Sequence, residues 1–183
     1  MAAKPVRRIV TGHHDDGRST VLIDALAPNV KQRTAGNAST LLWVTDECPA
    51  RMAGAGDRAA RDIGVPPPPR GTIFRLAEFP PGFGTDLRGK EALTDLAIAP
   101  DVAPGHRHPD PGVHRTRTID YVVVLEGEIQ LLLDDGELRL RAGDVVVQQA
   151  TNHAWINRGA LPCRLAMVFI DAEEPAQILS IGR

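Results

Sequence analysis

The sequence predicts an all-β protein built as a sandwich or barrel. About ten short runs rich in β-branched and aliphatic residues recur along the chain, and Gly, Pro, Asn or Asp separates them. One separator is Asp135-Gly136, which lies between two alternating apolar runs and is a strong hairpin signal. Helical periodicity is scarce by comparison. The fold class therefore rests on many short strands joined by turns.

The composition favours a small-molecule partner over a polymer or a membrane. The chain has 183 residues, which suits one domain, and a net charge of -2. Acidic and basic residues are scattered, so the sequence shows no footprint for nucleic acid or for an anionic membrane. The N-terminal segment lacks the pattern of a secretion signal, and no run of about 18 apolar residues occurs. We therefore expect a cytoplasmic protein.

Four segments follow one another along the chain. Residues 1–80 contain strands that we expect to pack on a barrel or to extend it. Residues 81–112 are rich in Gly and Pro and read as a loop, or as a lid over a site. Residues 105–171 carry the cleanest strand pattern and form the expected core. Residues 172–183 are expected to be a C-terminal tail.

Polar side chains with ligand chemistry share one face of two predicted strands. Alternate residues of a strand point to the same side, so one strand aligns four polar groups. These are His114, Thr116, Thr118 and Asp120. By the same parity a second strand aligns His153, Trp155 and Asn157. Two histidines and a carboxylate would converge if the two strands are neighbours.

With these spacings the sequence resembles the cupin superfamily, whose members carry two motifs on a small β-barrel. The first motif has the form HxH, three or four residues, Glu, six residues and Gly. Its positions are held here by His114, Thr116, Asp120 and Gly127, so a threonine replaces the second histidine and an aspartate replaces the glutamate. The second motif begins with Gly and ends with His, three residues and Asn, and it is matched by Gly143, His153 and Asn157. The resemblance implies a cupin-type β-barrel, a double-stranded β-helix or jelly roll, with extra N-terminal strands.

The resemblance also implies a metal site with one ligand replaced. In metal-binding cupins both histidines and the Glu of the first motif join the histidine of the second around one divalent ion. Carried over, the ligands are His114, Asp120 and His153, and the ion is Fe, Mn, Zn or Ni. Thr116 stands where the second histidine is usual, and a neutral hydroxyl is a poor ligand for these metals. A site that has lost this ligand and its metal is the open alternative.

Other residues complete the expected pocket. Its lining is expected to include Thr116, Trp155 and Asn157. The loop histidines His106 and His108 are candidate acid–base catalysts, and either is also a candidate replacement ligand.

The resemblance implies a metal-dependent enzyme acting on a small oxygenated organic substrate. Lyase or isomerase chemistry is the leading interpretation, meaning dehydration, decarboxylation or cyclisation through an enolate-like intermediate. A non-haem iron dioxygenase is the first alternative, because two histidines and a carboxylate leave coordination positions open. A non-catalytic ligand-binding or accessory cupin without metal is the second alternative. By analogy with small cupins, we expect a homodimer.

Overall fold

The computed structural model describes residues 3–52, 54, 56–85 and 112–173, and over these ranges the chain forms strands and no helix. The predicted all-β class is confirmed. It follows that these ranges contain no helix able to cross a membrane; the cytoplasmic location stays a prediction.

In chain order the strands are β1 (Arg7–His13), β2 (Ser19–Leu26), β3 (Val30–Gln32), β4 (Ala38–Thr45), β5 (Thr72–Phe79), β6 (Thr118–Glu126), β7 (Glu128–Leu133), β8 (Gly136–Arg141), β9 (Val145–Gln149), β10 (Ala154–Ile156) and β11 (Cys163–Asp171).

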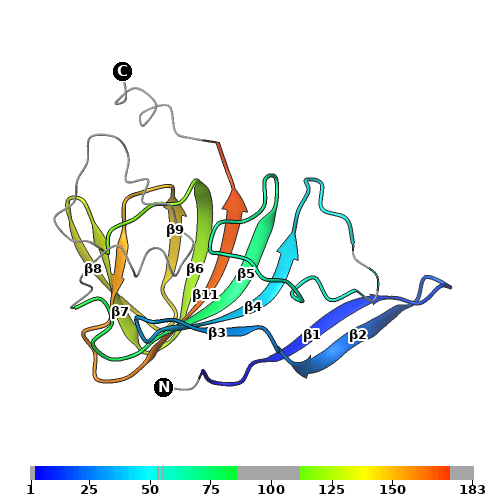
Figure 1. Cartoon of the computed structure of the whole chain (residues 1–183), viewed down its shortest axis with the longest axis horizontal. Helices are drawn as coiled ribbons and strands as arrows, with labels where there is room; N and C mark the ends of the chain where they lie inside the picture. The colour runs from blue at the N-terminus through cyan, green and yellow to red at the C-terminus, as the bar shows by residue number, and fades with distance from the viewer. Residues whose placement is uncertain (1–2, 53, 55, 86–111, 174–183) are drawn as a thin grey trace.

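Two antiparallel sheets make the body of the molecule. The larger has six strands in the order β3-β4-β5-β11-β6-β9, and the smaller has three in the order β10-β7-β8. Figure 1 shows the smaller sheet beside the β6 and β9 end of the larger one. The core includes Val122, Leu165 and Phe169 from the larger sheet and Ile129 and Leu131 from β7. Two sheets packed around a shared apolar core are the arrangement of a jelly roll.

Strand β6 serves both the core and a polar site. Its alternate side chains are buried, as expected for a strand with one face turned inward. Val122 and Val124, in its second half, join the apolar core. Thr118 and Asp120, in its first half, are each only 1% exposed. The inner face therefore changes from polar to apolar along one strand, which places buried polar groups at one end of the sandwich.

The N-terminal strands divide into two parts. Strands β3, β4 and β5 extend the large sheet, and β5 pairs with β11 from the other end of the chain. Strands β1 and β2 form a separate hairpin that projects from the body (Figure 1). Arg8 of β1 ties the hairpin to the body, because its Nη1 donates to the Leu42 carbonyl at 3.0 Å and to the Asp57 carboxylate at 2.9 Å.

The Asp-Gly signal correctly located a hairpin but not its central residues. Strands β7 and β8 pair so that Leu133 lies opposite Gly136, which leaves Asp134 and Asp135 as the two-residue turn. Neither aspartate has a positive φ, so the turn is not of the primed type that Asp-Gly favours. Gly136 is instead the fourth residue of the turn, and glycine is favoured at this position of ordinary type I turns.

Two expected segments lie mostly outside the described residues. These are the loop or lid, of which the structure describes only 81–85 and 112, and the tail, of which it describes only 172–173. His106 and His108 belong to the part of the loop that is not described, so their predicted acid–base role stays a prediction.

Candidate functional site

The two motif histidines lie side by side although they come from distant parts of the chain. His114 precedes β6 and His153 immediately precedes β10, and the two residues form an antiparallel bridge. The His114 N–H donates to the His153 carbonyl at 3.0 Å, and the His153 N–H donates back at 2.9 Å. Their rings are 4.5 Å apart between centroids. The backbone itself therefore holds the two imidazoles together.

Hydrogen bonds to carbonyl groups fix the tautomer of both rings. Nδ1 of His114 lies 2.9 Å from the Gly112 carbonyl, and Nδ1 of His153 lies 3.0 Å from the Thr151 carbonyl. A carbonyl only accepts, so each Nδ1 carries the proton. Burial lowers the pKa of both rings, that of His153 to about 3 with a smaller contribution from His114. Both imidazoles are therefore neutral at pH 7, and each Nε2 carries a lone pair.

Gln148 is a site residue that the sequence did not reveal. It lies on β9 directly opposite Asp120 of β6 and is 5% exposed. Its Nε2 donates to Oδ2 of Asp120 at 2.8 Å and lies 3.2 Å from Nε2 of His153. One amide nitrogen with two hydrogens thus links the carboxylate to the imidazole. The signal that could have found it is the pairing of the two motif strands, which places Gln148 across from Asp120.

Asp120 is a buried carboxyl group in an environment that disfavours its charge. Burial raises its pKa to about 6, although hydrogen bonds from Thr118 and Gln148 act in the opposite direction. Among the described residues, its Oδ1 has no hydrogen-bond partner, and neither has Oε1 of Gln148. Both are buried acceptors. Together with the Nε2 lone pairs they give the site more acceptors than donors, which suits a cation or a ligand that donates hydrogen bonds.

Comparison with known proteins identifies the family. A family model described as a cupin domain matches residues 101–169. The chain is also 32% identical over 176 residues to a cupin-domain-containing oxidoreductase, fogC, from Aspergillus ruber, covering 92% of this chain and 74% of the relative. The chain is a cupin. The family indicated by the two motifs is thereby confirmed.

Two further similarities accompany these. The phomopsin biosynthesis cluster protein C' of Diaporthe leptostromiformis is 38% identical to this cupin over 145 residues, covering 74% of this chain and 71% of the relative. A crystal structure of a Cupin 2 conserved barrel domain protein from Salinispora arenicola shares 13% identity, with a TM-score of 0.43, and the match covers 83% of this chain and 86% of that one.

The predicted metal ligands of this cupin are neighbours, but a glutamine lies among them. Within the described ranges, no three His, Cys, Asp or Glu side chains gather closely enough to hold a metal ion. The Gln148 amide instead links Asp120 to His153. The types of donor still fit a divalent ion, because neutral imidazole nitrogens and carboxylate oxygens are its usual ligands. Among the described residues, Oδ1 of the Asp120 carboxylate has no hydrogen-bond partner.

The expected pocket residues have different surroundings. The Thr116 hydroxyl lies 2.6 Å from that of Thr118, on the polar inner face. Trp155 is 6% exposed and belongs to the core, and its ring meets that of His153 edge-on at 6.2 Å. Asn157 is fully buried, and its Nδ2 donates to the Phe79 and Leu161 carbonyls. Asn157 therefore has no amide N–H left for a ligand, and it fixes the turn after β10.

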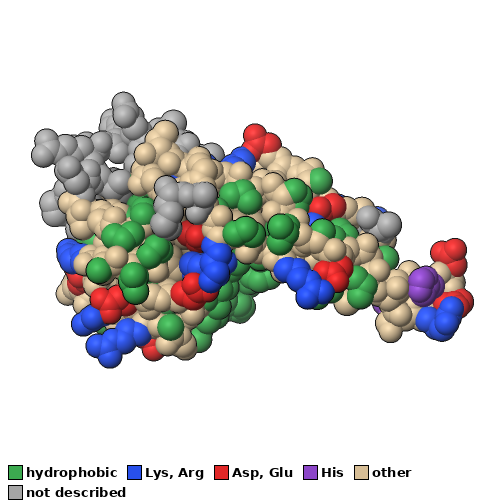
Figure 2. Space-filling view, turned by 90° about the horizontal axis from the view of Figure 1, so that it is seen from below, with side chains coloured by type: hydrophobic (Ala, Val, Ile, Leu, Met, Phe, Trp, Pro, Cys, Tyr) green, Lys and Arg blue, Asp and Glu red, His purple; other side chains and the backbone are tan. Residues whose placement is uncertain are grey.

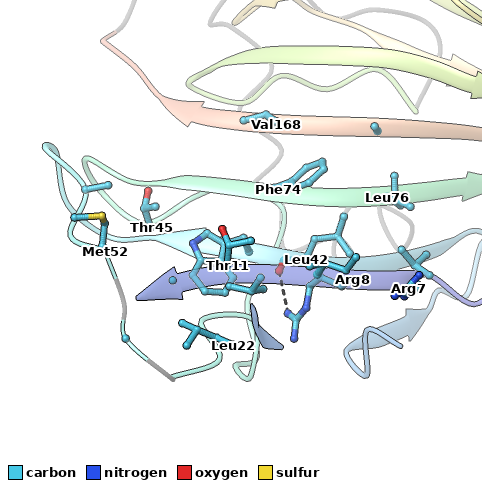
Figure 3. Close-up of a pocket in the computed structure, with 18 of the residues that line it drawn as sticks. Arg7, Arg8, Thr11, Leu22, Leu42, Thr45, Met52, Phe74, Leu76 and Val168 are labelled. Atoms are coloured by element: carbon cyan, nitrogen blue, oxygen red, sulfur yellow. Dashed lines mark hydrogen bonds between the residues drawn. The ribbon is translucent and has the colours of Figure 1, made fainter. Parts of the chain in front are cut away.

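A separate groove lies between the β1–β2 hairpin and the outer face of the large sheet. Its volume is about 1200 Å³. Figure 3 shows side chains of the sheet, among them Phe74 and Val168, on one side, and those of the hairpin, among them Thr11 and Leu22, on the other. The groove is mainly apolar and is not lined by either motif histidine. Exposed apolar surfaces of this kind mark places where a protein contacts another molecule.

Proposed function

We propose that this cupin is a metal-dependent enzyme that acts on a small oxygenated organic substrate at the buried cluster of His114, Asp120, Gln148 and His153. The observation that supports it most is the excess of acceptors. Within the described part of the chain, the buried polar atoms of this cluster that lack a partner are both acceptors, Oδ1 of Asp120 and Oε1 of Gln148. Buried acceptors without donors are costly, so the site is suited to a cation or to a substrate hydroxyl.

The ion proposed for this site is Fe, Mn, Zn or Ni, with His114, Asp120 and His153 as its ligands. When bound, it would supply Lewis acidity that stabilises negative charge developing on a substrate oxygen. The chain's own groups prepare the site for this. The carbonyls of Gly112 and Thr151 hold the protons on Nδ1, which leaves each Nε2 unprotonated with a lone pair for a metal ion. Trp155 packs against the ring of His153 in a T-shaped contact, which helps to hold that ring in place.

Lyase or isomerase chemistry is the leading reaction class. Dehydration, decarboxylation and cyclisation require charge stabilisation and a group that moves a proton. For the second task we propose His106 and His108. The hydroxyl of Thr116, which faces the same polar end of the sandwich, is proposed to contact a substrate oxygen.

Metal content tests the proposal directly. The protein is purified without chelator and without added metal, and its metals are measured by mass spectrometry. We expect about one equivalent of a divalent ion in the native chain and less than about a tenth in His114→Ala and in His153→Ala. His13→Ala, which changes an exposed histidine on the distant hairpin, is the matched control and should keep the metal.

The opposite result would point to the non-catalytic alternative. If the native protein holds less than about a tenth of an equivalent, takes up none when Fe, Mn, Zn or Ni is added, and matches its variants, the metal enzyme is ruled out. The barrel would then be a ligand-binding or accessory cupin.

The name of a relative supports a second reaction class, oxidation, which a non-haem iron dioxygenase would carry out. FogC is named an oxidoreductase, and two histidines with one carboxylate form the ligand set of such iron enzymes. Nitric oxide serves as a surrogate for dioxygen. Anaerobic protein loaded with Fe(II) should give the electron paramagnetic resonance signal of a high-spin iron nitrosyl if iron at this site binds oxygen. Loaded native protein without this signal would favour the lyase or isomerase class.

A further inference from the structure

The amide of Gln148 can point only one way while the two acceptors beside it are unprotonated. Its Nε2 lies 2.8 Å from Oδ2 of Asp120 and 3.2 Å from Nε2 of His153, which carries a lone pair because Nδ1 holds the proton. If the amide were turned over, its oxygen would face both acceptors, and three acceptors would repel one another. The nitrogen therefore occupies this position.

Gln148 contacts an atom that the proposed metal needs, Nε2 of His153. The lone pair on Nε2 of His153 can accept a hydrogen bond or bind a cation, but not both. Oδ2 of Asp120 is also engaged by the same amide. A metal ion can therefore bind His153 only after the Gln148 N–H has left it.

His153 does not depend on Gln148 for its orientation. Groups around a metal ligand usually strengthen binding because they hold the ligand's ring in place. Here that task belongs to the Thr151 carbonyl, which accepts from Nδ1 at 3.0 Å, and to the backbone bridge with His114. Removing the Gln148 amide therefore takes away a competitor and leaves the ring held.

We propose that Gln148 is a built-in competitor for the metal, which closes the metal-free site by hydrogen-bonding His153 and Asp120 and so sets how tightly the cluster binds a divalent ion. The inference rests on the proposed metal site. It also explains how the metal-free chain tolerates the cluster, because the amide satisfies two acceptors that would otherwise be buried without a donor.

The metal affinity of Gln148→Ala tests whether Gln148 competes with the metal. Co(II) is titrated into metal-free protein, and binding is followed by the visible absorption bands of the bound ion. Two lost hydrogen bonds predict a dissociation constant about tenfold lower than that of the native chain. Gln148→Met, which keeps most of the volume but has no N–H, should change the affinity in the same direction. The neighbouring Gln149, which is exposed, gives the matched control Gln149→Ala with native affinity.

A second measurement distinguishes whether Gln148 competes with the metal or supports its binding. In thermal unfolding without metal, Gln148→Ala should have a lower melting temperature than the native chain. With saturating Co(II), the difference in melting temperature between the two proteins should become smaller. An unchanged or weaker Co(II) affinity in both variants, with native binding intact, would overturn the inference and leave the proposed metal site standing. If Co(II), Zn(II), Mn(II), Ni(II) and Fe(II) bind neither the native chain nor the variants, both fail.

Discussion

At the scale of single residues, a largely buried ion pair between Arg8 and Asp57 anchors the hairpin. Arg8 is 7% exposed, and its guanidinium binds both carboxylate oxygens of Asp57, at 2.9 and 2.5 Å. The Ala59 N–H donates to the same carboxylate at 2.9 Å. These contacts, Arg8 foremost, hold the pKa of Asp57 below its ordinary value. The negative charge of Asp57 is thus part of what keeps Arg8 buried.

Replacing this carboxylate should reduce stability in a pH-dependent way. Because the folded-state pKa of Asp57 is lowered, its stabilisation is present above the unfolded-state pKa and is lost as the pH falls through the folded-state value. Asp57→Asn should therefore cost about 2 kcal/mol at pH 7, by leaving a buried guanidinium without its counter-charge. Urea unfolding at pH 7 and at pH 3 should show the gap between the two proteins closing in acid. A gap that is equal at both values would contradict this origin.

The residues of the site could be predicted only in part. Strand parity was enough to place Thr118 and Asp120 on one inner face, and the spacing of the two motifs picked out His114 and His153. Gln148 was missed because its role comes from the register between β6 and β9, which has to be known before Gln148 can be placed across from Asp120.

At the scale of elements, the two motif glycines meet different constraints. Gly127 joins β6 to β7 with φ at +76°, and a Cβ there would lie 2.5 Å from the Pro162 carbonyl oxygen. Gly143 also has a positive φ, +97°, yet nothing lies within 4 Å of where its Cβ would be. Both positions need the backbone freedom of glycine, but only at Gly127 would a Cβ also collide with neighbouring atoms.

An alanine at each glycine should therefore give unequal losses. Gly143→Ala should lower the free energy of unfolding by about 1 kcal/mol, the cost of a positive φ, whereas Gly127→Ala should cost about 3 kcal/mol or more because the Pro162 segment must also move. Chemical denaturation of the two variants measures both values. Equal losses, or a larger loss at Gly143, would show that the close contact is not limiting.

Strands are the elements that the sequence predicted best. Alternation and turn residues located the β7–β8 hairpin, because local chemistry decides such a hairpin. The division of the N-terminal strands was not predictable in the same way. Strand β5 enters the large sheet by pairing with β11, a contact between distant segments, whereas β1 and β2 pair only with each other.

At the scale of the whole molecule, the outer face of the large sheet and the hairpin above it are apolar and exposed. Figure 2 shows the hairpin projecting from the body, with charged side chains and a histidine at its tip. Phe74, Tyr121 and Val147 are 39, 48 and 58% exposed on the sheet, and Ile9 and Val21 are 51 and 54% exposed on the hairpin. An isolated two-stranded hairpin is marginally stable in water. We propose that a second copy covers these surfaces, in a homodimer related by twofold symmetry.

Light scattering during size-exclusion chromatography tests the dimer. The native protein should elute as two copies of the 19.7 kDa chain. Phe74→Asp, which puts a charge into the apolar face, should shift it to the monomer. Leu138→Asp, at a 53% exposed position on β8 of the other sheet, is the matched control and should stay dimeric. A native monomer at micromolar concentration would contradict the proposal.

The contacts of the site also join the two sheets of the molecule. Asp120 and Gln148 belong to the large sheet, whereas His153 leads into β10 of the small one, so their contacts cross from one sheet to the other. If each sheet forms its own hydrogen bonds before the two dock, the chain at that stage has its strands but no site. Recovery of the cluster's hydrogen bonds should therefore be among the last steps of refolding, and an ion that binds it would stabilise only the fully docked state.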